Sequence, residues 1–128
     1  MKEIQSNINI IGGGLIGAVT AYSLSKLDNK VVVLEQNTKF NHKNILDKRT
    51  TAISEGTKKF LEEINIWNLI SDYAEPIRKI QIIDRNQTNK IYFDNQRRHS
   101  NLGYIVKNEF ILDSLYRKLQ KHRVSVLK

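Results

Sequence analysis

The sequence predicts an α/β protein with a parallel sheet and an inserted antiparallel hairpin. A β-branched run at Asn7–Ile11 leads into three glycines, and a helical segment connects these to a second apolar strand at Val31–Leu34. Two apolar strands joined by a helix within about 30 residues form a βαβ unit. The strands of such a unit are parallel, and helices cover the faces of their sheet. Farther along, the runs Lys79–Asp84 and Lys90–Phe93 flank the turn-like Arg85-Asn86-Gln87 and predict the hairpin.

The composition limits the class of protein. The 128 residues suffice for one ordinary domain but are few for an enzyme with separate cofactor and substrate domains. Because cysteine is absent, disulfides, thiolate nucleophiles and cysteine-ligated metals are excluded. No apolar run reaches the roughly 20 residues of a membrane-spanning helix, and the start lacks the pattern of a signal peptide. We therefore expect a soluble, cytoplasmic protein without a transmembrane segment, with which a peripheral membrane contact remains compatible.

The charge is strongly positive but does not predict a nucleic-acid partner. The chain carries 21 Lys+Arg against 13 Asp+Glu, a net charge of +8. These basic residues are scattered and are not interleaved with aromatic side chains, as stacking on single strands would require. The three histidines, His42, His99 and His122, lack ligand spacing, so no metal site is predicted. No pairing of carboxylates suggests acid–base chemistry, and no catalytic residue is assigned.

The first half of the chain carries the predicted βαβ unit. Leu15–Leu27 is helical in pattern, with small Ala18 and Ala21 on one side, and Asp28-Asn29 ends it. Glu35 closes the second strand. The polar, basic stretch Gln36–Thr51 has no periodicity and predicts a long loop.

The middle of the chain predicts two helices before the hairpin. Ile53–Ile64 has apolar residues at helical spacing, and a shorter helix is expected over Trp67–Tyr73. Glu75-Pro76 is expected to end this helix, because the residue before proline avoids helical conformation. Tyr104–Val106 is expected to add a third strand to the hairpin.

The last part of the chain predicts a helix and a final strand. Asn108 is a good N-cap, and the charges of the first and last turns suit the helix dipole. Val124–Leu127 is an apolar strand. The apolar stripe of the helix comprises Ile111, Leu112, Leu115 and Leu119.

The glycine triplet belongs to a G-x-G-x-x-G motif, which predicts a dinucleotide site in this context. Gly12 permits the tight turn, Gly14 lets a diphosphate approach the backbone, and Gly17 lets helix and strand pack closely. The helix N-terminus then offers N–H groups and a partial positive charge to the diphosphate. Glu35 is placed to accept hydrogen bonds from a ribose diol, and its charge would repel a 2′-phosphate. A glycine-rich turn that binds nothing is the alternative.

The spacing of the strands favours FAD over a nicotinamide cofactor. In a simple NAD-binding fold, the third parallel strand follows the second after one short crossover. Here roughly 90 residues separate Glu35 from Val124, and they include the hairpin. This layout indicates a cofactor domain into which part of a second, antiparallel domain is inserted.

Several segments resemble the FAD-dependent aromatic hydroxylases, and most of all the branch that hydroxylates ubiquinone precursors. The segments are GGGLIGA, the strand end at Glu35, DKRTTAIS (Asp47–Ser54), IW (Ile66-Trp67), AEPIRKIQIID (Ala74–Asp84) and LGYIVKNEFILDSL (Leu102–Leu115). The resemblance implies a Rossmann-like FAD-binding domain over residues 1–77 and 107–128, and an incomplete substrate domain that contributes antiparallel strands at 78–106. It also implies that Arg49 points toward the flavin and that Asn108 contacts it, although a capping role for Asn108 is equally open. Gln36 departs from the basic residue common at its position in the family.

The resemblance implies a monooxygenase that hydroxylates an aromatic small molecule, with FAD as the cofactor, NAD(P)H as the transient reductant and dioxygen as the oxidant. Members of this family are several times longer, and their second FAD motif lies beyond the end of this chain. We therefore expect an N-terminal piece that is inactive by itself, either from a truncated reading frame or from a split gene in which a downstream polypeptide completes the enzyme. Two other interpretations stay open: a fragment of a nicotinamide-dependent dehydrogenase, and a non-catalytic remnant or nucleotide-binding module.

Overall fold

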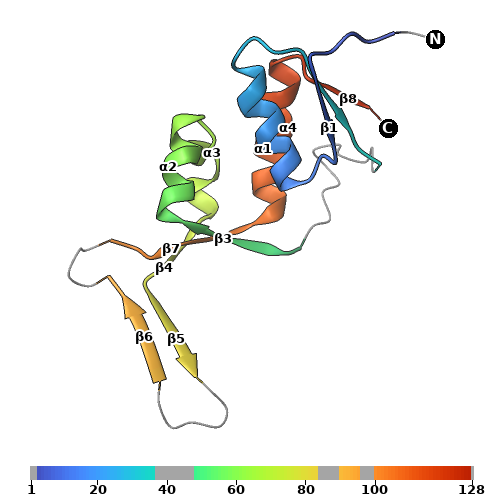
Figure 1. The fold of residues 1–128 in the computed structure, drawn as a ribbon. Helices are drawn as coiled ribbons and strands as arrows, with labels where there is room; N and C mark the ends of the chain where they lie inside the picture. The colour runs from blue at the N-terminus through green and yellow to red at the C-terminus, as the bar shows by residue number, and fades with distance from the viewer. Residues whose placement is uncertain (1–2, 37–47, 84–89, 96–99, 128) are drawn as a thin grey trace. The chain divides into compact units, whose positions relative to one another are not determined.

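The computed structural model describes residues 3–36, 48–83, 90–95 and 100–127 (Figure 1). Their contacts divide the chain into two compact units, residues 1–49 with 108–128 (the first unit) and residues 50–107 (the second unit). The contacts thus group residues 50–77 with the hairpin, whereas the sequence assigned them to the cofactor domain. The assignment of 1–77 and 107–128 to FAD and of 78–106 to a substrate domain stays a prediction.

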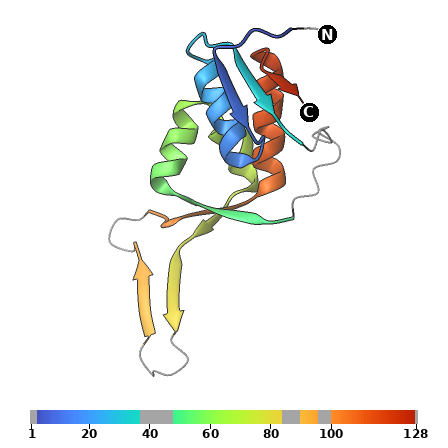
Figure 2. The same cartoon turned by 45° about the vertical axis from the view of Figure 1, so that its right-hand side comes forward.

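The first unit is a parallel sheet with two helices. Strands β1 (Ile8–Ile11), β2 (Val31–Leu34) and β8 (Ser125–Leu127) pair in the order β1-β2-β8, with every pair parallel. Helices α1 (Leu15–Ser25) and α4 (Asn108–Lys121) lie side by side behind the sheet in Figure 2. The predicted α/β fold is therefore confirmed, including the parallel pairing of the final strand.

The side chains of β1 alternate between a covered and an open face of the sheet. A Cβ built on Gly17 would lie 3.5 Å from Cγ2 of Ile10, so Ile10 faces α1. Because successive strand side chains point to opposite faces, Ile11 faces away from this helix, and it is 88% exposed. Ala18 and Ala21 of α1 are fully buried, as their small size predicts for close packing.

The second unit begins with a strand and three helical segments. Strand β3 (Thr50–Ser54) leads into α2 (Glu55–Glu63), and Ser54 Oγ accepts a hydrogen bond from Thr57 N at 3.2 Å, which caps the helix. Helix α3 (Trp67–Ile70) and the 3₁₀ helix η1 (Ser71–Tyr73) follow, where one short helix was predicted. Ile66 and Ile70 are fully buried and form the centre of this unit's core.

Three strands of the second unit correct the sequence prediction. Ile53 lies in strand β3 and not in the helix, and Glu75–Ile77 forms strand β4 where only a helix end was expected. Strand β7 (Gly103–Lys107) pairs antiparallel with β3 and β4, in the order β3-β7-β4, and does not extend the hairpin. Because β4 is an edge strand, Pro76 costs the sheet little.

The hairpin is confirmed as the antiparallel pair β5 (Lys79–Ile83) and β6 (Lys90–Asp94). Cross-strand partners share a face, so the pairs Ile80–Phe93 and Ile82–Ile91 make one face wholly apolar. All ten strand residues are exposed. The predicted turn at 85–87 lies outside the described residues.

Candidate nucleotide-binding site

The turn between β1 and α1 has the tight geometry that its glycines allow. Gly12 adopts φ +95°, a conformation that other residues rarely take, and its N–H donates to the carbonyl of Leu34 at 2.8 Å. A Cβ on Gly17 would lie 1.8 Å from the carbonyl oxygen of Gly12. Helix α1 therefore approaches the turn as closely as a glycine permits, which fixes the helix end beside the carboxyl end of β1.

The N-terminus of α1 has the properties of an anion site. Gly14 is the N-cap residue, so no side chain caps the helix, and its first turn contains no acidic residue. A Cβ built on Gly14 meets nothing within 4 Å, so the space beside this backbone is open. Backbone N–H groups at a helix start attract a negatively charged group such as a diphosphate. The residues present thus fit the diphosphate of a dinucleotide.

Glu35 lies at this turn, as its place at the end of β2 predicts. Its Oε2 accepts a hydrogen bond from the N–H of Gly13 at 2.6 Å, and its own N–H donates to the carbonyl of Leu127 at 2.7 Å. The carboxylate of the second strand is therefore within hydrogen-bond distance of the glycine turn. This brings together the diphosphate-binding and ribose-binding parts of the predicted site.

Tyr116 of α4 is a further residue at the turn, which the sequence analysis missed. Its hydroxyl donates to the carbonyl of Gly13 at 2.7 Å. Burial, together with the nearby charge of Glu35, raises the pKa of the Tyr116 hydroxyl to about 12. Tyr116 follows Leu112 by four residues and so shares its buried side of the helix; that spacing could have indicated burial, but nothing in the sequence names Gly13 as its partner.

The two residues expected near the flavin ring, Arg49 and Asn108, are neighbours. The N–H of Asn108 donates to the carbonyl of Arg49 at 2.9 Å, and Asn108 is the first residue of α4, whereas the sequence predicted it as the N-cap that precedes the helix. Asn108 is 5% exposed, whereas Arg49 is exposed. At 1.5 Å rise per residue, Asn108 lies about 12 Å along α4 from Tyr116. Gln36 is exposed beside Glu35.

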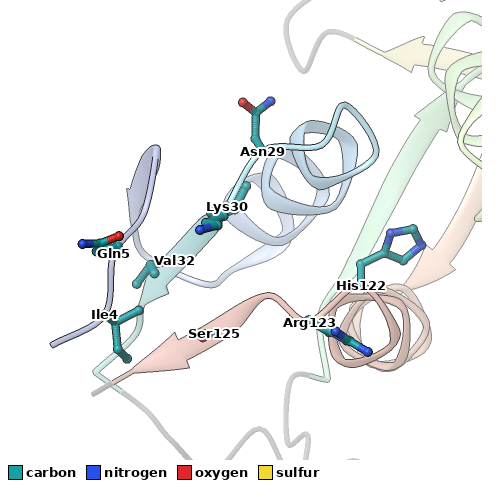
Figure 3. Close-up of a pocket in the computed structure, with 9 residues that line it drawn as sticks. Ile4, Gln5, Asn29, Lys30, Val32, His122, Arg123 and Ser125 are labelled. Carbon is teal, nitrogen blue, oxygen red and sulfur yellow. The ribbon is translucent and has the colours of Figure 1, made fainter. Parts of the chain in front are cut away.

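A pocket of about 230 Å³ lies at the opposite end of the sheet, at the amino ends of β2 and β8 (Figure 3). Lys30, His122 and Arg123 contribute to its lining. Arg123 follows the carboxyl end of α4, where positive charge complements the helix dipole. The pocket lies away from the glycine turn, which follows the carboxyl end of the parallel strand β1. Within the described ranges, no group of acidic or histidine side chains could hold a metal, and no helix could cross a membrane.

Comparison with known proteins finds a matching family and several relatives. The family described as "NAD(P)-binding Rossmann-like domain" matches residues 10–41, which include the glycine turn, α1 and β2. Ubiquinone biosynthesis monooxygenase COQ6 of Drosophila melanogaster is 30% identical over 118 residues, 86% of this chain and 25% of that protein. Ubiquinone hydroxylase UbiL of Rhodospirillum rubrum is 25% identical, over 89% of this chain and 27% of that protein. The resemblance predicted from the motifs is confirmed, and the chain spans about a quarter of the length of these relatives.

Solved structures share the fold. The p-nitrophenol 4-monooxygenase PnpA of Pseudomonas putida DLL-E4 superposes with a TM-score of 0.75 at 18% identity, covering 100% of this chain and 32% of that one. PqsL of Pseudomonas aeruginosa, described as a probable FAD-dependent monooxygenase, gives 0.75 at 17% identity, over 95% of this chain and 32% of that one. The Rossmann-like α/β architecture is therefore shared with these chains.

Proposed function

We propose that this chain is the FAD-binding N-terminal part of a flavin-dependent monooxygenase that hydroxylates an aromatic ring of the ubiquinone-precursor type. NAD(P)H would be the reductant and dioxygen the oxidant. The observation that carries the proposal is the glycine turn between β1 and α1, with an uncapped helix N-terminus on one side and Glu35 on the other. The ubiquinone hydroxylases among the relatives supply the reaction class.

The residues of the first unit would hold the adenosine diphosphate half of FAD. The N–H groups at the start of α1 would bind the diphosphate, and the open space at Gly14 would let it reach the backbone. Glu35 would accept hydrogen bonds from the ribose diol and orient the sugar. When bound, the flavin supplies the oxygen-transfer chemistry, while this chain contributes position and charge.

We propose flavin contacts for Arg49 and Asn108 as well. Both flank one backbone hydrogen bond at the start of α4, the helix that also brings Tyr116 to the glycine turn. An extended dinucleotide bound at that turn could follow this helix toward them. The aromatic substrate, a downstream polypeptide that completes the enzyme, a peripheral membrane contact and the cytoplasmic location are parts of the same proposal.

The family described as NAD(P)-binding favours one alternative, a fragment of a nicotinamide-dependent enzyme. The same turn and carboxylate would hold the adenosine half of either dinucleotide, and ADP binding alone does not separate them. The interpretation as a non-catalytic nucleotide-binding module would share this ADP site too. Titration with FAD, NAD and ADP in parallel separates the cofactors, because only the proposed one gains affinity from its second half.

The test of the proposed function is ligand titration of the unaltered chain and of Gly14→Val, at matched folding by circular dichroism. We expect ADP and FAD to bind the unaltered chain and to bind Gly14→Val at least about tenfold more weakly, since the valine would occupy the diphosphate's space. Gly56→Val, in the second unit, is the control and should leave the affinity unchanged. Absence of ADP and FAD binding in the unaltered chain, or equal affinity in Gly14→Val, would overturn the proposal.

A further inference from the structure

The peptide groups on both sides of Gly13 are held by side chains from two other elements. On one side, Tyr116 of α4 donates its hydroxyl proton to the Gly13 carbonyl at 2.7 Å. On the other, the Gly13 N–H donates to Glu35 Oε2, after β2, at 2.6 Å. Gly13 is buried, so neither bond competes freely with water. The backbone of the glycine turn is thus held by side chains of the same unit.

This arrangement explains a glycine that the motif does not demand. Gly13 occupies the first unspecified position of G-x-G-x-x-G, where many residues would satisfy the motif. Here a Cβ on Gly13 would lie 2.2 Å from the Tyr116 hydroxyl oxygen and 3.2 Å from Glu35 Oε2. A side chain would therefore have to displace the tyrosine. Gly13 and Tyr116 form one structural pair, although 103 residues separate them.

We propose that Tyr116 is a positioning residue of the nucleotide site, whose hydroxyl holds the Gly13 peptide and, through it, the Glu35 carboxylate in the geometry that receives the ribose and diphosphate. The identity of the ligand rests on the proposed function. A site that is ordered before the ligand arrives loses less conformational entropy on binding, so fixing the turn raises affinity without a direct contact.

Tyr22 of α1 provides a matched control in the same unit. It is as buried as Tyr116, at 2% exposure against 3%, and burial raises the pKa of its hydroxyl too. Its ring contacts His122 edge-on at a centroid distance of 5.1 Å, and within the described part of the chain its hydroxyl makes no hydrogen bond. Tyr22→Phe removes the same atom as Tyr116→Phe but leaves the turn alone.

The first experiment compares Tyr116→Phe, Tyr22→Phe and the unaltered chain without ligand. Amide hydrogen exchange, followed by NMR, reports whether the Gly13 N–H stays bonded to Glu35. We expect Gly13 to exchange at least about tenfold faster in Tyr116→Phe, and at the original rate in Tyr22→Phe. ADP affinity should fall about three- to tenfold in Tyr116→Phe only, the scale of one hydrogen bond.

A second measurement tests the pairing itself. Gly13→Ala should lower the melting temperature less in the Tyr116→Phe background than in the unaltered chain, because the phenylalanine lacks the oxygen that the new methyl group would meet. Additive effects would mean that the two residues act separately and would count against the proposal.

The outcomes separate the two proposals. If the unaltered chain binds ADP, and Tyr116→Phe matches it in both affinity and Gly13 exchange, the role of Tyr116 is overturned and the proposed function stands. If the unaltered chain binds neither ADP nor FAD, the proposed function is overturned, and the nucleotide role of Tyr116 falls with it.

Discussion

Gly14 and Gly17 stand in the same motif, but a side chain would meet very different surroundings at each. At Gly14 the space is open, whereas at Gly17 a Cβ would meet the Gly12 carbonyl. We expect Gly14→Ala to change the free energy of unfolding by less than about 1 kcal/mol, a cap-sized effect. Gly17→Ala should lower it by about 2–3 kcal/mol, because backbone must move. Urea unfolding followed by circular dichroism measures both, and equal losses would contradict this steric account.

Glu35 is expected to contribute a charged hydrogen bond to the ligand as well as to the turn. Glu35→Ala should weaken ADP-ribose-type ligands by about 1–3 kcal/mol. It should also reduce discrimination against ligands with a 2′-phosphate, because the repelling charge is gone. Glu3→Ala removes an exposed carboxylate of the same unit and serves as the control. Calorimetric titration of both variants checks this, and an unchanged profile in Glu35→Ala would make Glu35 only the end of a strand.

Tyr116 makes the free energy of unfolding depend on pH above pH 10. Burial, then the Glu35 charge, raises the pKa of Tyr116 from 10.0 to about 12, so the folded chain holds this proton more tightly than the unfolded chain. The resulting stabilisation is fully present below pH 10 and is lost as the pH rises toward 12. Denaturant unfolding between pH 9 and 12 should therefore show a shallower loss in Tyr116→Phe than in the unaltered chain; parallel losses would contradict it.

At this scale, the sequence predicted the residues whose roles depend on near neighbours. Gly12 lies in the turn, Gly17 lies near the start of α1, and Glu35 directly follows the adjacent strand, so local spacing brings them together. Tyr116 could not be found in this way, because its contact with Gly13 depends on how α4 packs beside α1 within the first unit. The side-chain roles of Arg49 and Asn108 toward a flavin stay predictions.

Helix α3 is the element whose packing is easiest to test. Ile70 is fully buried at its end, whereas its neighbour Leu69 is 41% exposed. Ile70→Ala should lower the free energy of unfolding by about 2–5 kcal/mol through the cavity it leaves, and Leu69→Ala by less than about 1 kcal/mol. Thermal and urea unfolding measure both values. Similar losses in the two variants would mean that α3 is not anchored through Ile70.

The elements that the sequence predicted well are those with a clear apolar pattern, such as the continuous apolar run of β2 at Val31–Leu34 and the apolar stripe of α4. Strands β3 and β4 lack such a pattern. Ile53 has helical spacing to the apolar residues of α2, and only pairing of β3 with the distant β7 makes it a strand residue. Pro76 reads as a break, yet an edge strand tolerates it. Long-range pairing decided both, and it cannot be read from local sequence.

Exposed apolar surface favours self-association of the chain. The apolar hairpin face is open to solvent, and Ile11 on the edge strand β1 is almost fully exposed. We expect the purified 128-residue chain to self-associate, because exposed strand edges and apolar patches favour association. We also expect no flavin to survive purification, since the two proposed contacts from Arg49 and Asn108 are few for the flavin half. Gel filtration and a flavin absorbance scan measure both; a monomeric, yellow protein would contradict the expectation.

Two double variants of the hairpin test whether its apolar face causes the self-association. Replacing the cross-strand pair Ile82 and Ile91 with threonine keeps strand propensity and removes apolar surface, so it should shift the chain toward the monomer. Replacing Gln81 and Tyr92, the neighbouring pair on the opposite face, with threonine should leave self-association unchanged. Equal effects of the two changes would show that the apolar face is not the contact.

The hydrogen bond between Arg49 and Asn108 has a consequence for how the length of the inserted segment can change in evolution. The first unit ends at Arg49 and resumes at Asn108, and the next residues, Thr50 and Lys107, are paired partners in β3 and β7. The second unit is therefore inserted between two chain positions of the first unit that lie next to each other. Segments inserted at such a point can lengthen, shrink or be exchanged over generations while the parallel strands keep their path, because the hydrogen bond between Asn108 and Arg49 fixes both ends of the insertion.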